Sequence, residues 1–103
     1  MSQELIAKSA AEFFNVDLAE LKSPCRKDAL AWPRNICIYI AHGKGTPKST
    51  IGRFWNRDRT VVYNSIRRVN ERLESYPKKR VEYSNFLRYL ETQKQKRKRE
   101  LGI

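Results

Sequence analysis

The fold of this chain is decided by residues 46–73, which read TPKSTIGRFWNRDRTVVYNSIRRVNERL. Thr46 followed by Pro47 predicts a helix start, because a threonine hydroxyl can cap a helix and proline is tolerated in its first turn. This short helix should end in a tight turn at residues 55–57. Asp58 then predicts the cap of a second helix, since its carboxylate can accept the free N–H groups of a first turn.

The second helix has two contrasting faces. Apolar residues recur at spacings of four, three and four positions, which places them on one side of the helix. They are Val62, Ile66, Val69 and Leu73. The opposite side carries Thr60, Val61, Asn64, Arg67 and Arg68, with Arg59 at its start. Two helices joined by a short turn, the second apolar inside and basic outside, are typical of a DNA-binding helix-turn-helix. An ordinary amphipathic surface helix has the same two faces, so both interpretations stay open on this stretch alone.

The charge of the chain favours a polyanionic partner. Its 103 residues include 22 Lys and Arg against 11 Asp and Glu, a net charge of +11. The excess lies in residues 22–103, because residues 1–21 hold one lysine and four acidic residues. With 40% hydrophobic residues, the chain can still fold around one modest core. Nucleic acid is the favoured partner. A membrane surface is not, since no segment has the broad apolar face that this requires.

The sequence also indicates a cytoplasmic, nucleoid-associated location. No apolar run approaches the length of a membrane span, and the N-terminus has acidic residues where a signal peptide has an apolar segment. The two cysteines are too few for a zinc site. Cys37 lies in the apolar run ICIYIA and is expected in the core. Cys25 is expected to be a free thiol in a basic loop.

The rest of the chain predicts further helices and no sheet, so the fold class is all-α. Residues 3–14 have an apolar stripe, and Asp17 predicts the cap of a short helical turn whose leucines return to the core. Residues 22–27, KSPCRK, predict a loop. A longer helix should span about residues 28–42, and Pro33 must either begin it or leave its first turn irregular.

A last helix should follow a turn at residues 75–77. Its apolar side consists of Tyr83, Phe86, Leu87 and Leu90. Beyond it, residues 94–99 read KQKRKR and have nothing apolar to bury. We therefore expect one domain over residues 1–92, followed by a basic tail over residues 93–103 that is disordered or frayed in the free protein.

Nothing in the sequence predicts an enzyme, a cofactor or a metal site. Gly43-Lys44-Gly45-Thr46 lacks the spacing and the preceding strand of a nucleotide-binding phosphate loop. His42 is the only histidine, and no nucleophile motif accompanies it. We expect neither nucleotide binding nor catalysis.

Basic residues outside the second helix complete the candidate DNA-binding set. Arg26 and Lys27 are either solvated loop charges or a loop that enters the minor groove, where the negative potential attracts arginine. Other cations near the helix-turn-helix are candidates for phosphate contacts, which set register and affinity without specifying sequence. These are Arg34, Lys44, Lys48, Arg53 and Arg57.

Taken together, these parts resemble the C-terminal DNA-binding domain of the bacterial replication initiator DnaA. The family signature, close to G-G-R-D-H-T-T-V, is matched by NRDRTVV at residues 56–62, and the family's A-R-P-R-Q by AWPRN at residues 31–35. Ile51-Gly52 matches an Ile-Gly ahead of the turn, and SNFLRYL at residues 84–90 resembles the family's S-N-L-I-R-T-L. The resemblance covers roughly residues 3–91. It implies a small helical bundle of the kind also found in Trp repressor.

The resemblance implies roles for individual residues. Arg26 aligns with a loop arginine that enters the minor groove. The motif Arg-Asp-x-Thr, which approaches bases and phosphates in the major groove, aligns with Arg57, Asp58, Arg59 and Thr60. Two positions depart from the family, since Arg59 replaces a histidine and Val61 replaces the second threonine. Arginine prefers O6 and N7 of guanine, and valine can contact only a thymine methyl group. These departures favour a different recognition site.

We therefore expect sequence-specific binding to double-stranded DNA, with the helix-turn-helix in the major groove and the basic loop in the minor groove, as in origin recognition by DnaA. The nucleotide-binding domain of DnaA is not in this sequence, so we expect a stand-alone protein that forms no ATP-driven filament. One alternative is a transcription regulator of a phage or mobile element. Another is a non-specific RNA-binding or scaffold protein, which a strong preference for one duplex sequence would exclude.

Overall fold

The computed structural model describes residues 2–102, and within this range it consists of helices and connections without a strand. The all-α class predicted from the sequence is confirmed. The helices are α1 (Gln3–Phe13), α2 (Leu18–Lys22), α3 (Asp28–Gly43), α4 (Lys48–Trp55), α5 (Arg59–Ser75) and α6 (Pro77–Glu100). None of these described helices is both long and apolar enough to cross a lipid bilayer.

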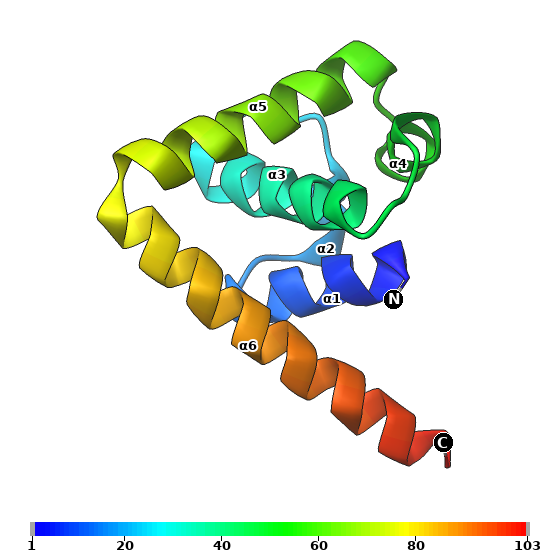
Figure 1. Cartoon of the computed structure of the whole chain (residues 1–103). Helices are drawn as coiled ribbons and strands as arrows, with labels where there is room; N and C mark the ends of the chain where they lie inside the picture. The colour runs from blue at the N-terminus through cyan, green and yellow to red at the C-terminus, as the bar shows by residue number, and fades with distance from the viewer. Residues whose placement is uncertain (1, 103) are drawn as a thin grey trace.

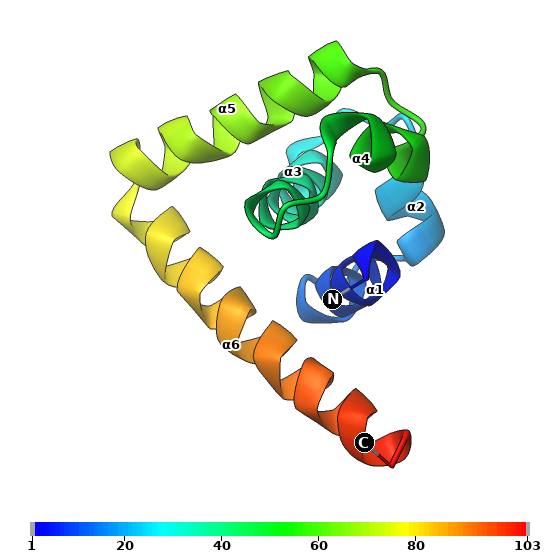
Figure 2. The ribbon, with the colours of Figure 1, turned by 45° about the vertical axis from the view of Figure 1, so that its right-hand side comes forward.

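Helix α3 lies at the centre of the bundle and packs against α1, α2, α4 and α5. Helices α5 and α6 form the two arms of a V that meet at Tyr76, and α1 and α3 lie between these arms (Figure 1). Figure 2 shows α2 and α4 on the open side of the V. The arrangement brings α4 and the start of α5 together at one end of the molecule, while α6 ends at the other.

The core takes apolar side chains from all six of these helices. Ile36 of α3 and Trp55 of α4 are fully buried. Phe13 of α1 packs against Phe86 and Tyr89 of α6, with ring centroids 5.3 and 5.5 Å apart. These aromatic contacts hold α6 against the N-terminal helix, and therefore fix the lower arm of the V.

Two leucines expected in the core lie largely outside it. Leu18 at the start of α2 is 40% exposed, and Leu87 of α6 is 39% exposed. Leu21, Phe86 and Leu90 are buried instead. The physical reason is that a helix turns only one side toward the core, so apolar residues off that side remain at the surface.

Side-chain caps account for three of the six described helix starts, those of α1, α2 and α5. The carboxylates of Asp17 and Asp58 accept hydrogen bonds from backbone N–H groups in the first turns of α2 and α5, at 2.8 and 3.0 Å, as predicted. The predicted Thr46 cap is wrong. The residue before α4 is Pro47, which makes no side-chain cap, because the Thr46 N–H bonds back to the carbonyl of Ala41 (3.1 Å) and ties Thr46 to the end of α3.

Helix α3 runs through Pro33 instead of beginning at it. At its start the carbonyl of Lys27 accepts from the N–H of Leu30 three residues on (2.9 Å), the 3₁₀ pattern, and from the N–H of Ala31 four residues on (2.8 Å), the α pattern. The N–H that Pro33 lacks would have bonded to the carbonyl of Ala29 in the first turn, so only one hydrogen bond near the start is lost and the helix continues to Gly43. Of the two alternatives left by the sequence, a helix that begins at Pro33 is wrong, and an irregular first turn stays a prediction.

A polar cluster fixes the bend between α5 and α6. The indole N–H of Trp32 in α3 donates to the carboxylate of Glu82 in α6 (2.6 Å). The Arg72 guanidinium and the Lys79 ammonium lie 5.2 and 5.0 Å from the centre of the same ring. Arg72 also pairs with Asp28 (2.7 Å). Three helices are thereby joined, which sets the direction of α5.

The predicted tail lies in the last turns of α6, and its disorder or fraying in the free protein stays a prediction. Helix α6 continues to Glu100, although no described side chain beyond Leu90 is buried. The last turns are therefore held by their own backbone and not by a core. The domain boundary between residues 92 and 93 stays a prediction.

Candidate nucleic-acid interface

The turn between α4 and α5 depends on a glycine. The N–H of Arg57 donates to the carbonyl of Gly52 (2.8 Å), and Asn56 between them has a left-handed conformation with φ of 55°. A Cβ atom placed on Gly52 would lie 2.5 Å from the carbonyl oxygen of Arg57, which is backbone and cannot rotate away. Glycine therefore lets the two helices approach this closely, and together they form the predicted helix-turn-helix.

Helix α5 turns one face to the core and the other to solvent, as predicted. Val62 is fully buried. On the outer face Arg59, Thr60 and Val61 are exposed, and Asn64 is half-buried. These side chains lie at the N-terminal end of the helix, which is the end that meets base edges in helix-turn-helix proteins. The helix dipole makes the same end positive, which favours a nearby phosphate.

Arg34 is placed differently from its predicted role. Its side chain is only 6% exposed. Its Nε donates to the carbonyl of Leu21 (2.7 Å), and one Nη donates to those of Ser23 (2.9 Å) and Cys25 (3.1 Å). Burial, and then the charge of nearby Arg57, lower the pKa of Arg34 from its usual value, although an arginine stays charged in proteins. Arg34 thus supports the loop from inside, and its predicted role as a phosphate contact is wrong because its donors are already bonded to the loop.

Arg57 ties the same loop to the helix-turn-helix. One Nη donates to the carbonyl of Trp55 (2.6 Å), and the other donates to the carbonyl of Ser23 (2.6 Å), which is 34 residues away in the sequence. The guanidinium groups of Arg34 and Arg57 therefore converge on one loop oxygen. The loop that carries Arg26 is held at a set position relative to the start of α5.

A cleft of about 560 Å³ separates this loop from α5. Its lining includes the cations Lys22, Arg26, Arg34, Arg57 and Arg68 and, among the described residues, no acidic side chain. Val61 and Asn64 of the outer face of α5 also line it. Since a basic loop forms one wall and the outer face of α5 the other, the cleft suits a phosphate backbone that passes between two grooves.

The other predicted phosphate contacts lie on the surfaces of the loop and of α4. Arg26, Lys27 and Arg53 are exposed, and Lys48 is half-buried. Arg53 makes one long hydrogen bond, to the hydroxyl of Thr50 (3.4 Å). Such weakly held side chains can reorient toward a ligand at little cost.

Two cations of the cleft were outside the predicted contact set, namely Lys22 and Arg68. Lys22 begins the basic loop, and its ammonium lies 4.0 Å from the centre of the Phe54 ring. Two sequence features could have indicated them: Lys22 lies in KSPCRK, and Arg68 lies on the outer face of α5.

Arg67, which was predicted as a DNA contact, is paired with Glu71 (3.8 Å). This pair is exposed and contributes little, so it does not fix Arg67.

Comparisons with known proteins point to one family. A family model described as "Bacterial dnaA protein helix-turn-helix" matches residues 3–69. The chromosomal replication initiator protein DnaA of Rickettsia bellii is 34% identical over 91 residues, covering 85% of this chain and 19% of that protein. DnaA of Geobacter metallireducens is 35% identical over 72 residues (68% and 16%), and DnaA of Wolbachia pipientis 44% over 69 residues (64% and 15%). The chain spans less than a fifth of the length of these relatives.

Proposed function

The chain belongs to the bacterial DnaA helix-turn-helix family, and from that premise we propose that it binds a specific double-stranded DNA sequence through two adjacent grooves. One observation carries the proposal. The exposed start of α5 and the loop with Arg26 lie on opposite sides of a cleft lined by five cations and, among the described residues, by no acid. A phosphate backbone in this cleft would have the major groove on one side and the minor groove on the other.

Base reading in the major groove is proposed for the first turns of α5. Arg59 is exposed and can donate two hydrogen bonds to O6 and N7 of a guanine. Asn64 has the amide that pairs with N6 and N7 of an adenine, and Val61 offers an apolar contact to a thymine methyl. Thr60 and the cap Asp58 lie at the same end. Asp58 is engaged with the backbone of α5, so its role is partly structural.

Affinity is proposed to come from the surrounding cations, which neutralise phosphates without reading sequence. Lys48 and Arg53 of α4 flank the turn, and Arg67 and Arg68 continue along the outer face of α5. Lys27 supports Arg26 in the loop, where the narrow minor groove attracts cationic side chains. Arg57 contributes by holding this loop, as its bond to Ser23 indicates.

The biological role follows from the relatives only in outline. Their printed name is chromosomal replication initiator protein, so recognition of sites at a replication origin is the first proposal for this chain. Regulation of transcription by the same kind of binding is the second, because site recognition alone does not distinguish the two. A non-specific RNA-binding scaffold is a third, and duplex selectivity separates it from both.

Selection of bound sites from a random duplex pool tests the proposal. We expect one motif to be enriched, and a duplex carrying it to bind about 10³-fold more tightly than a scrambled duplex or a single strand. Neutralisation of about five phosphates should give a log–log salt slope of roughly −4 to −5 on duplex DNA. If no motif is enriched and RNA binds as well as duplex DNA, the protein is a non-specific nucleic-acid binder.

A further inference from the structure

A second basic surface lies at the C-terminal end of α6. Five of the six residues in KQKRKR are cationic, namely Lys94, Lys96, Arg97, Lys98 and Arg99. None of them forms an ion pair with another described residue. Leu90 is the last buried residue, and ten further residues at about 1.5 Å each extend the helix roughly 15 Å past it. The charges therefore project from the body of the protein.

This surface faces away from the helix-turn-helix. In both Figure 1 and Figure 2 the C-terminal end of α6 is at the bottom of the molecule, and α4 and the start of α5 are at the top. The principal extents of the molecule are 39 × 31 × 26 Å. A duplex seated on the start of α5 consequently lies on the side of the molecule opposite to the end of α6.

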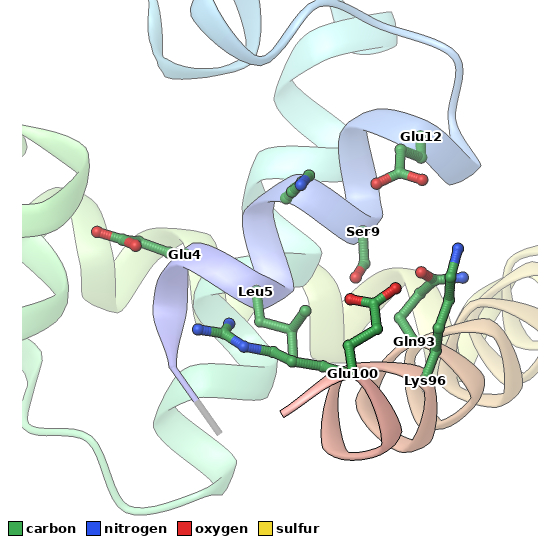
Figure 3. A pocket seen from close by; sticks show the side chains of 9 residues that line it. Glu4, Leu5, Ser9, Glu12, Gln93, Lys96 and Glu100 are labelled. Carbon is green, nitrogen blue, oxygen red and sulfur yellow. The ribbon is translucent and has the colours of Figure 1, made fainter. Parts of the chain in front are cut away.

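The side of α6 that faces α1 is already balanced in charge. Figure 3 shows Gln93, Lys96 and Glu100 of α6 turned toward the groove that α1 lines with Glu4 and Glu12. Arg97 lines the groove as well, whereas the other three cations of the segment, Lys94, Lys98 and Arg99, do not. A mostly positive face thus remains beside the groove, and its one carboxylate is that of Glu91, which lies about one helical turn before Lys94.

We propose that the end of α6 holds a second DNA duplex, so that one molecule bridges two duplexes or two distant segments of one. The first duplex is the one bound under the proposed function, on which this inference rests. Residues 91–103 contain no aromatic side chain, whereas binding to single strands depends on aromatic stacking. The segment also lacks the apolar face needed at a membrane surface. A duplex, with one charge per about 1.7 Å of axis, is the polyanion that a rod of cations without stacking groups fits best.

A two-duplex capture experiment tests the bridge. The selected-site duplex is fixed to a surface, saturated with the full chain and washed, and a fluorescent scrambled duplex is then added at about 50 mM salt. We expect capture of the fluorescent duplex in proportion to the bound protein, and loss of this capture as salt rises. Capture of fluorescent RNA hairpins and of anionic vesicles is measured in parallel channels, in place of the fluorescent duplex.

A matched pair of variants locates the second site. Lys98→Gln with Arg99→Gln removes two charges at the end of α6. Lys78→Gln with Arg88→Gln removes two exposed charges elsewhere on the same helix. The first variant should make the salt slope of second-duplex capture shallower by roughly two units and leave binding of the fixed duplex unchanged. The control variant should change neither.

The outcomes separate this inference from the proposed function. Equal capture by both variants, or stronger capture of vesicles or RNA than of duplex, overturns the bridge while site-specific binding stands. If the Lys98 and Arg99 variant loses affinity for the fixed duplex, the end of α6 lies along the first duplex. That result also overturns the bridge. If no site is selected at all but scrambled duplex still binds through α6, the proposed function fails and the second surface remains.

Discussion

Among single residues, Gly52 decides how closely the two helices of the motif approach. Gly52→Ala should destabilise the protein by about 1–3 kcal/mol, because the added methyl group meets backbone 2.5 Å away and forces the turn to open. Gly43→Ala is the matched control, since a Cβ atom there meets nothing within 4 Å. Denaturant unfolding followed by circular dichroism measures both. Equal stability of the two variants would show that the turn is looser than described.

Arg57 is a positioning residue whose partner is the loop. Arg57→Ala removes two charged hydrogen bonds of 2.6 Å, each of a kind that contributes about 1.5–3 kcal/mol, so the loop should become mobile. The half-buried thiol of Cys25 lies in this loop and reports on it, and the buried Cys37 serves as an internal reference. We expect faster thiol labelling at Cys25, together with a loss of affinity for the selected site.

Arg53→Ala provides the contrast for this experiment. Arg53 is exposed and bonds only within α4, so its removal should leave Cys25 labelling unchanged while the salt slope of DNA binding becomes shallower by about one unit. Unchanged Cys25 labelling in Arg57→Ala as well would mean that the Ser23 contact does not hold the loop.

Among the helices, α3 and α5 are joined by an ion pair that responds to acid. The hydrogen bond from Arg72 to Asp28 lowers the pKa of that carboxyl group below its ordinary value of 3.8. A lowered pKa stabilises the fold above the unfolded-state value and ceases to do so as the pH falls through the folded-state value. Asp28→Asn should therefore be less stable than the parent at pH 7, by at most about 1 kcal/mol because the pair is exposed.

This difference should begin to shrink as the pH falls below the ordinary carboxyl pKa of 3.8, and it should disappear once the pH is below the lowered pKa of folded Asp28. Glu4→Gln is the control, since Glu4 lies in the first turn of α1 as Asp28 does in α3 but forms no ion pair with a described residue. Urea unfolding of the three proteins across pH measures the effect. A difference that persists at low pH would assign the effect of Asp28→Asn to helix capping.

The helices also show what the sequence could predict. Asp17 and Asp58 accept hydrogen bonds from backbone N–H groups within three residues, so their caps could be predicted from the local sequence. The spacing of Val62 and Val69 likewise indicated the buried side of α5. The role of Arg34 in supporting the loop could not be predicted from the sequence, because its partners are carbonyls that only the folded chain brings near it.

The same reason applies to Arg57, whose bond to Ser23 spans 34 residues. A cation beside a helix-turn-helix has the same local pattern whether it contacts phosphate or holds a loop. Lys22 was missed for the same reason, since its place in the cleft depends on how α2 ends against α4. Sequence pattern thus located the interface, and tertiary contacts divide its cations into those that support the loop and those exposed to a ligand.

For the molecule as a whole, the extent of the folded domain can be measured. A chain ending at residue 92 should keep its melting temperature within about 2 °C, because no described side chain beyond Leu90 is buried. A chain ending at residue 88 loses Tyr89 and Leu90, which pack against α1 and the core, and removal of such core contacts costs several kcal/mol. A large fall in melting temperature when the chain is truncated at residue 92 would place the domain boundary further along α6.

The central claim is that one molecule reads two adjacent grooves, and affinity on a panel of single-base-pair variants of the selected site tests it most directly. We predict two groups of sensitive base pairs centred roughly five apart, since a helical turn is about 10–10.5 base pairs. Arg59→Ala should cost about 1–3 kcal/mol and abolish sensitivity at one base pair of one group, while the base pairs read by Asn64 and Val61 stay sensitive. Arg26→Ala should abolish only the A·T preference of the other. If both variants weaken every duplex of the panel by one common factor, the two side chains contact phosphates and the two-groove account is contradicted.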